Sequence, residues 1–294
     1  MSSDQAIAEF VSYALLAVFL TITLANRSMV HPLLNLVNRW VRWVLFANTI
    51  AFLVTSQSWT DRPFWAVFII AFLIWFLLET IYNWIYIRAL SFSEVPLFPR
   101  YRTSQKEEWP IDARWIDVKR WMRESSYQTE GSYEALLIQD LMIRNVVFDR
   151  ADKMLRIQVV FLPQTSSRVP PYFILTSIDQ DGQRVVTNNL PLPFGGIYPK
   201  SWNVARRPLT RKIDRLVEIH EQRVLKKSFK PVAFDDNALE ELNRQQQALE
   251  QANVQGGFLH AHEYREDYGV LSSNGRYRLW KEIWSLNYLG KAIG

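Results

Sequence analysis

Cysteine is missing from the 294-residue sequence. Its absence excludes a disulfide framework, a thiolate metal site and a cysteine nucleophile. Histidine is scarce, with four residues in the whole chain, so few side chains could serve as a general base. The glycine-rich phosphate loops and nucleophile elbows typical of many enzymes do not occur either. We therefore expect no cofactor, and a non-catalytic role is the preferred hypothesis.

Charge is nearly missing from three apolar stretches in the first third of the chain. Residues 10–26 and 43–60 carry no charge, and residues 63–87 contain only Glu79. A helix needs about 20 mostly apolar residues to cross a bilayer, within a range of about 17–25. The sequence therefore predicts a membrane protein with three N-terminal transmembrane helices. Their expected bounds are about residues 10–26, 41–58 and 63–87, within a transmembrane domain of residues 1–88.

Basic residues next to these stretches predict the orientation. The loop expected at residues 27–42 contains three arginines and no acid, and further basic residues follow the third stretch. Lys and Arg concentrate in short cytoplasmic loops. We therefore expect a multi-pass protein of the inner (cytoplasmic) membrane, with its N-terminus outside and its C-terminal domain in the cytoplasm. The orientation is the same if the first stretch lies on the membrane instead of crossing it.

The remaining residues predict a cytoplasmic α+β domain at 113–294, which follows a proline-interrupted linker at 89–112. Two hairpins are expected around turn-forming segments, and together they predict a small antiparallel sheet of at least four strands. The expected strands are residues 141–148, 154–162, 172–178 and 184–187, and an irregular loop follows at 188–202. Helices are expected at residues 113–124, 209–228, 237–254 and 276–288. The first of these helices either packs its tryptophans on the core or lies on anionic lipid, and packing is preferred.

Glu79 is the one acidic residue inside the expected spans. A carboxylate at this depth costs about 2.5–3.5 kcal/mol on insertion scales, so it normally finds a polar partner. Asn48 lies at a similar expected depth in the second span, and a Glu79–Asn48 hydrogen bond is the structural interpretation. A proton or ion relay is the alternative. A contact with a helix of another subunit is favoured over that relay, because three helices can hardly enclose a pore.

The densest basic stretch of the chain runs from residue 206 to residue 230. We expect a helix whose polar face binds an acidic protein or lipid headgroups, and a plain solvated face is the alternative. Nucleic-acid binding is disfavoured, because the stretch lacks the interleaved aromatic side chains that stack on single strands. The candidate binding residues are Arg206, Arg207, Arg211, Lys212, Arg215, Arg223, Lys226 and Lys227.

Two further patterns lie near the C-terminus. Tyr277, Trp280 and Trp284 share a face of the last expected helix and form a candidate aromatic docking face. His260 and His262 stand two residues apart near several acids, and only a strand would bring both imidazoles to one face. A solvated loop is preferred to a metal site there, so no metal is expected.

These features together predict a membrane-anchored subunit or scaffold of a multi-protein complex of the secretion, conjugation or respiratory type. Its cytoplasmic domain would bind other subunits, in an oligomer or a hetero-complex in contact with membrane lipids. One alternative is a membrane enzyme or transporter that uses Glu79 as a proton or ion site. Another is a membrane-tethered ligand sensor.

Overall fold

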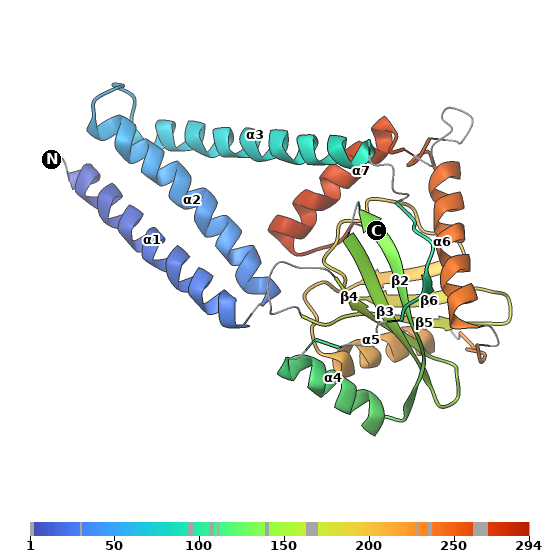
Figure 1. The fold of residues 1–294 in the computed structure, drawn as a ribbon. Coiled ribbons are helices and arrows are strands. Elements are labelled where there is room, and N and C mark those ends of the chain that lie inside the picture. Colours follow the sequence, from blue (N-terminus) through green and yellow to red (C-terminus); the bar gives the residue numbers. More distant parts are fainter. Residues whose placement is uncertain are drawn as a thin grey trace. The chain divides into compact units, whose positions relative to one another are not determined.

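The computed structural model describes residues 3–29, 31–92, 97–105, 109–110, 112–138, 141–162, 170–226, 229–234, 237–260 and 270–293. These residues form two compact units, whose elements are labelled in Figure 1. The first unit comprises Met1–Arg88 together with Ile283–Gly290, and the second comprises Ala89–Glu282 together with Lys291–Gly294. The chain therefore leaves the first unit after its third helix and returns to it close to the C-terminus.

The first unit is built on three helices, α1 (Ser3–Met29), α2 (Pro32–Ser56) and α3 (Phe64–Ser91). Helices α1 and α2 run antiparallel and side by side (Figure 1). His31 is the N-cap of α2: its side chain accepts a hydrogen bond from the backbone N–H of Leu33. Its own N–H donates to Asn26 Oδ1 at 2.7 Å, which closes the short connection between the two helices.

Two helices of the first unit are long and apolar enough to cross a membrane, namely Glu9–Arg27 within α1 and Phe64–Ser91. They support a membrane-anchored protein, but the second of the three expected spans is not confirmed. The loop expected at residues 27–42 is largely the first part of α2. Arg39 and Arg42 therefore lie within this helix. Its charge-free part, residues 43–56, is shorter than the roughly 17 residues that a span needs.

The second unit contains a seven-stranded sheet in the order β1-β2-β3-β4-β5-β6-β7. The strands are β1 (Arg102–Thr103), β2 (Tyr127–Ile138), β3 (Leu141–Arg150), β4 (Arg156–Phe161), β5 (Tyr172–Ile178), β6 (Arg184–Asn188) and β7 (Trp202–Arg206). Both expected hairpins, β3–β4 and β5–β6, are confirmed. The small antiparallel sheet that the sequence predicts is not confirmed. The sheet has seven strands and is mixed, because β7 pairs with β6 in parallel. Strands β1, β2 and β7 lie outside the expected strands. The edge strands β1 and β7 have two and five residues, so their own residues signal them weakly.

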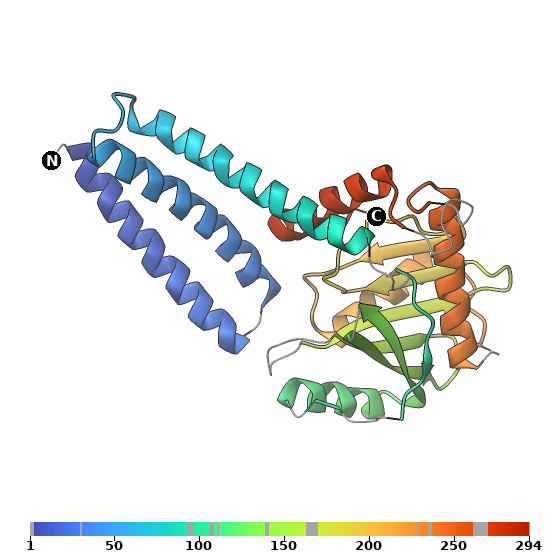
Figure 2. The same ribbon diagram turned by 45° about the horizontal axis from the view of Figure 1, so that its top comes forward.

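Helices cover both faces of the sheet (Figure 2). Helices α4 (Ala113–Glu124) and α5 (Ile213–Lys226) pack on one face, and α6 (Ala238–Gln255) packs on the other. Trp115, Val118 and Met122 of α4 are buried in the core against alternate residues of β4, including Ile157 and Val159. The preferred interpretation of α4, that its tryptophan packs on the core, is therefore confirmed for Trp115.

The sheet face beneath α6 carries buried polar side chains. Arg156 of β4 is 1% exposed and makes two hydrogen bonds of 2.7 Å to the equally buried Asp149 of β3. On the same face Arg184 pairs with Glu241 of α6, whose carboxylate also accepts from Gln245 at 3.0 Å. Each buried charge thus has an opposite charge beside it, as burial in a low-dielectric interior requires.

The last helix differs from the expected one. Helix α7 (Ser273–Trp284) is followed by the π-helix η2 (Ser285–Leu289), which ends at Gly290 with a φ of 62°. The helix expected to begin at residue 276 begins earlier, because Asn274 and Gly275 lie in the first turn of α7. Ser272 Oγ accepts from the N–H of Gly275 at 2.9 Å and so caps this helix.

Candidate functional site

Glu79 lies at the centre of a polar cluster in the first unit. The hydroxyl of Tyr288 donates to its carboxylate, and Trp75 Nε1 donates to Oε2 at 3.0 Å. Arg39 Nη1 lies 3.5 Å from Oε1. Three donors from α2, α3 and η2 therefore converge on this acid, whose side chain is 12% exposed.

The expected Glu79–Asn48 pair differs from the arrangement in the structure. Asn48 Nδ2 donates to Ser12 Oγ of α1 at 2.7 Å. Asn48 is buried, so this bond ties α2 to α1 within the apolar part of the unit. Sequence reasoning missed Tyr288 as a partner of Glu79, because the two residues are 209 positions apart.

The expected aromatic docking face is divided between the two units. Trp284 stacks on Tyr288 at 4.7 Å between ring centroids and lies 5.8 Å from Trp43 of α2. Tyr277 is 52% exposed and stacks on Trp280 at 5.8 Å in the second unit. Residues 283–290 thus use their aromatic rings to pack on the apolar helices, and Tyr277 stays accessible.

The basic stretch expected on one helix face spreads over β7, a loop and α5. Arg206 ends β7 and pairs with Glu282. Arg215 and Glu218, both of α5, pair with each other. Arg223 donates to Val186 O at 2.6 Å and to Asn203 O at 2.7 Å. Arg207, Arg211 and Lys212 precede α5, and Lys226 ends it, while Lys227 lies outside the described residues. Arg206 and Arg223 therefore hold the sheet and its helices together.

His220 of α5 is 1% exposed and lies between two hydroxyl groups. Its Nε2 is 3.1 Å from Ser177 Oγ, and its Nδ1 is 3.0 Å from Thr187 Oγ1. Burial lowers the pKa of His220 to about 3, and the positive charge of Arg223 lowers it further. The imidazole is therefore neutral and enclosed, so it does not reach a substrate.

The described residues contain no group of three or more His, Cys, Asp or Glu side chains placed to hold a metal ion. His260 is exposed, and its expected neighbour His262 lies outside the described part of the chain. The candidate metal patch around His260 and His262 therefore lies mostly outside the described residues.

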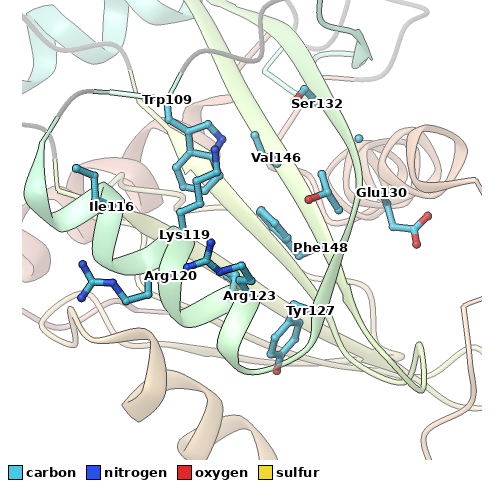
Figure 3. Close-up of a pocket in the computed structure, with 13 residues that line it drawn as sticks. Trp109, Ile116, Lys119, Arg120, Arg123, Tyr127, Glu130, Ser132, Val146 and Phe148 are labelled. Carbon is cyan, nitrogen blue, oxygen red and sulfur yellow. The ribbon is translucent and has the colours of Figure 1, made fainter.

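A groove of about 820 Å³ opens between α4 and strands β2 and β3 of the second unit (Figure 3). Its floor is aromatic and apolar, and its walls are basic on α4 and polar on β2. The lining residues are Trp109, Ile116, Lys119, Arg120, Met122, Arg123, Tyr127, Thr129, Glu130, Gly131, Ser132, Val146 and Phe148. We name this feature the α4–β2 groove.

The positive charge of the groove comes from α4. Lys119 Nζ lies over the ring of Trp109 at 5.8 Å, and Figure 3 shows Lys119 and Arg123 between α4 and the strands, with Arg120 pointing away from them. Glu130, the acid in the lining, lies 3.8 Å from Lys153. Among the described residues, no carboxylate forms an ion pair with Lys119 or Arg123. The groove therefore offers two cations above an aromatic floor.

In the described part of the chain, the strand wall of the groove is a partly open sheet edge. Strand β1 pairs with β2 at Glu134 and Tyr133, and the N–H of Ser104 donates one further bond to Ser132 O. Within the described part of the chain, residues 127–131 pair with β3 alone. A bulge lies between Thr129 and Gly131. The helix expected at residues 113–124 does not by itself predict the groove, because the groove requires β2 to lie beside α4.

Comparisons with protein-family models, with curated proteins and with solved structures found no match.

Proposed function

We propose that this protein is a non-catalytic, membrane-anchored subunit or scaffold of a multi-protein complex. In this proposal, the second unit binds an extended acidic segment of a partner protein in the α4–β2 groove. The observation that carries the proposal is the pair of cations, Lys119 and Arg123, across an apolar floor from residues 127–131 of β2, which among the described residues pair with β3 alone.

An extended peptide suits the groove for two reasons. The edge of β2 at residues 127–131 offers backbone groups to an added strand, and strand addition is a common mode of peptide recognition. The alternate side chains of such a strand would enter the groove, where Lys119 and Arg123 favour acidic ones. Complementary charges of this kind supply specificity and fast association.

The proposal includes three transmembrane helices in an inner membrane, with the N-terminus outside and the second unit in the cytoplasm. Helix α2 has 25 residues, so it would cross with Arg39 and Arg42 within its length and with α1 packed beside it. Its bond from Asn48 to Ser12 would satisfy a buried amide. Arg39 and Arg42, near the start of α2, would then lie at the cytoplasmic side, in agreement with the rule for basic residues.

A transporter that works through Glu79 receives less support. The carboxylate already has three donors, Tyr288, Trp75 and Arg39, as expected of an acid that holds helices together. A tethered sensor differs from the preferred function only in the occupant of the groove, which would be a small acidic ligand.

Charge reversal in the groove tests the docking proposal. The purified full-length protein in mild detergent is titrated against a fluorescent peptide of alternating Asp and Val residues, and fluorescence anisotropy reports binding. We expect Lys119→Glu/Arg123→Glu to raise the Kd at least tenfold, which corresponds to about 1.4 kcal/mol. Added salt should weaken wild-type binding, because the contacts are exposed charges.

The matched control is Lys212→Glu/Lys226→Glu, which removes two cations of the basic stretch and leaves the groove intact. This variant should bind the peptide with a Kd close to that of the wild type. If the control loses binding and the groove variant keeps it, the basic stretch is the docking surface and the groove proposal is wrong. Tight binding of free aspartate by the wild type alone would instead favour the sensor.

A further inference from the structure

The first unit contains a pocket of its own, with a volume of about 490 Å³. It lies among α2, α3 and η2, all of which belong to this unit. Its lining residues are Arg39, Arg42, Trp75, Leu78, Glu79, Tyr82, Asn83 and Asn287. We name it the arginine pocket.

Two cations of α2 line the arginine pocket. Arg39 and Arg42 are three residues apart and therefore share a helix face. The guanidinium of Arg42 lies over the ring of Trp75 at 5.5 Å. No acid among the described residues forms an ion pair with Arg42, so its charge is available to a ligand.

The acid of the pocket, Glu79, is already bound by groups of the protein. One carboxylate oxygen accepts from Tyr288 and Trp75, and the other lies 3.5 Å from Arg39. Glu79 thus holds Arg39 in place and offsets one of the two positive charges. The pocket keeps a net positive charge, centred on Arg42.

An amide donor in the lining has no partner among the residues that the structure describes. Asn83 is 7% exposed, and its Nδ2 is buried without an acceptor among the described residues. A buried donor without an acceptor is unfavourable and rare in folded proteins. Because Asn83 lines the pocket, a ligand oxygen that reaches this amide would supply the missing acceptor.

The outer side of the pocket continues into exposed apolar surface. Leu78 is 54% exposed and Tyr82 is 69% exposed on α3, a helix of membrane-spanning length. Ile81 and Ile85 extend the same exposed surface along this helix. A ligand in the pocket would therefore combine an anionic head with an apolar tail.

We propose that the arginine pocket binds the phosphate headgroup of an anionic phospholipid. Arg42 and Arg39 face the phosphate charge, Asn83 donates to a phosphate oxygen, and the acyl chains lie along the exposed face of α3. Basic pockets between membrane helices are a known mode of recognition for anionic headgroups. This lipid site is separate from the α4–β2 groove, so either proposal can fail without the other.

Lipid-dependent thermal stability tests the proposal. The purified full-length protein is mixed with vesicles of phosphatidylglycerol, with vesicles of phosphatidylcholine, or with inorganic phosphate, and its unfolding midpoint is measured. Native mass spectrometry of the same detergent samples counts bound lipid. We expect phosphatidylglycerol alone to raise the midpoint. Arg42→Ala should lower the affinity at least fivefold, and the exposed Arg62→Ala serves as the matched control with wild-type affinity.

Asn83→Leu separates lipid binding from a structural role. This variant removes the donor that lacks a partner, so its stability without lipid should stay equal or rise, while its affinity for phosphatidylglycerol falls. Equal lipid affinity in the wild type, Arg42→Ala and Asn83→Leu would overturn the proposal. An equal shift with inorganic phosphate would also overturn it, because the site would then bind phosphate without a lipid.

Discussion

His220 has its tautomer set by its neighbours. Ser177 Oγ uses its proton to donate to Met154 O at 2.8 Å, so it accepts from the imidazole at Nε2. Thr187 Oγ1 accepts from Arg223 at 2.6 Å, so its hydroxyl proton is available to Nδ1. Protonation of Nδ1 would leave the buried hydroxyl proton of Thr187 without its acceptor. Burial is the main cause of the low pKa of His220, and this arrangement of hydrogen bonds likewise disfavours the charged imidazole.

The pH dependence of stability follows from this pKa. The pKa of His220 is about 3 in the folded protein and 6.5 without the fold, so the unfolded chain binds the proton first as the pH falls. The contribution of His220 is therefore complete above about pH 6.5 and decreases as the pH falls towards 3. Between pH 7 and pH 5 this loss should be about 2 kcal/mol in the free energy of unfolding.

Urea unfolding of the full-length protein in detergent measures this loss, with His220→Gln as the comparison. Other acids titrate in both proteins, so the difference between the two curves isolates the imidazole. The wild-type advantage should shrink as the pH decreases from 7 to 5. A constant difference would show that His220 keeps its ordinary pKa.

A second residue-scale prediction concerns the buried pair Arg156–Asp149. Asp149→Leu leaves a guanidinium without its charge partner in a site that is 1% exposed, and should destabilise the protein by about 3–5 kcal/mol. Asp149→Leu/Arg156→Met removes both charges and should recover much of that loss. Urea unfolding of both variants measures the difference, and equal losses would contradict the proposed role of the pair.

At the element scale, residues 283–290 pack against the apolar helices of the first unit. Tyr288 makes ring contacts with Trp40 and Trp43 at 5.3 and 5.1 Å, and Trp40 Nε1 donates to its carbonyl oxygen at 2.9 Å. Burial raises the pKa of Tyr288, and the carboxylate of Glu79 raises it further, so its hydroxyl keeps its proton and can donate. The π-helix places the ring of Tyr288 against α2 and its hydroxyl against Glu79 of α3.

Truncating Tyr288 should therefore release this segment. We expect Tyr288→Ala to increase amide hydrogen exchange in residues 283–290, and Tyr288→Phe to have a smaller effect because it keeps the ring contacts. Tyr277→Ala is the control, since Tyr277 is 52% exposed. Unchanged exchange in Tyr288→Ala would show that other contacts hold the segment.

The strands that could be predicted carry their pattern in neighbouring residues, and the strands that were missed depend on residues elsewhere in the chain. The β3–β4 and β5–β6 hairpins were predicted because alternating apolar residues flank local turns such as the one at Gly182, whose φ is 74°. Strands β1, β2 and β7 were missed. The two and five residues of β1 and β7 carry little pattern of their own, and register shifts interrupt β2. The pairing partners of β1 and β7 are remote in sequence or lie across an irregular loop.

At the scale of the whole molecule, the proposed orientation can be tested because the chain has no cysteine of its own. Thr60→Cys places a single thiol between α2 and α3, and Asp181→Cys places one in the β5–β6 turn. With three spans and the N-terminus outside, a maleimide that does not cross membranes should label Thr60→Cys in intact cells. Asp181→Cys should react only after lysis. The opposite pattern, or equal labelling of both variants, would contradict the proposed topology.

The sequence alone determined the features that depend on local composition. These are the apolar character of the first third of the chain, the local hairpins, most of the helices and the position of Glu79 as an acid in an apolar helix. Each follows from hydrophobic periodicity or turn chemistry within a few neighbouring residues.

Only the tertiary structure decided which polar groups meet. It gave Glu79 a partner 209 residues away, paired Arg206 and Arg223 with groups of the fold, and brought α4 beside β2. Partners of this kind are chosen by the packing of remote elements, because a buried charge or donor is tolerated only where the folded chain supplies its counterpart. The three apolar stretches of the sequence thus predicted a membrane anchor. The fold showed that residues 283–290 pack on the helices of that anchor through Tyr288.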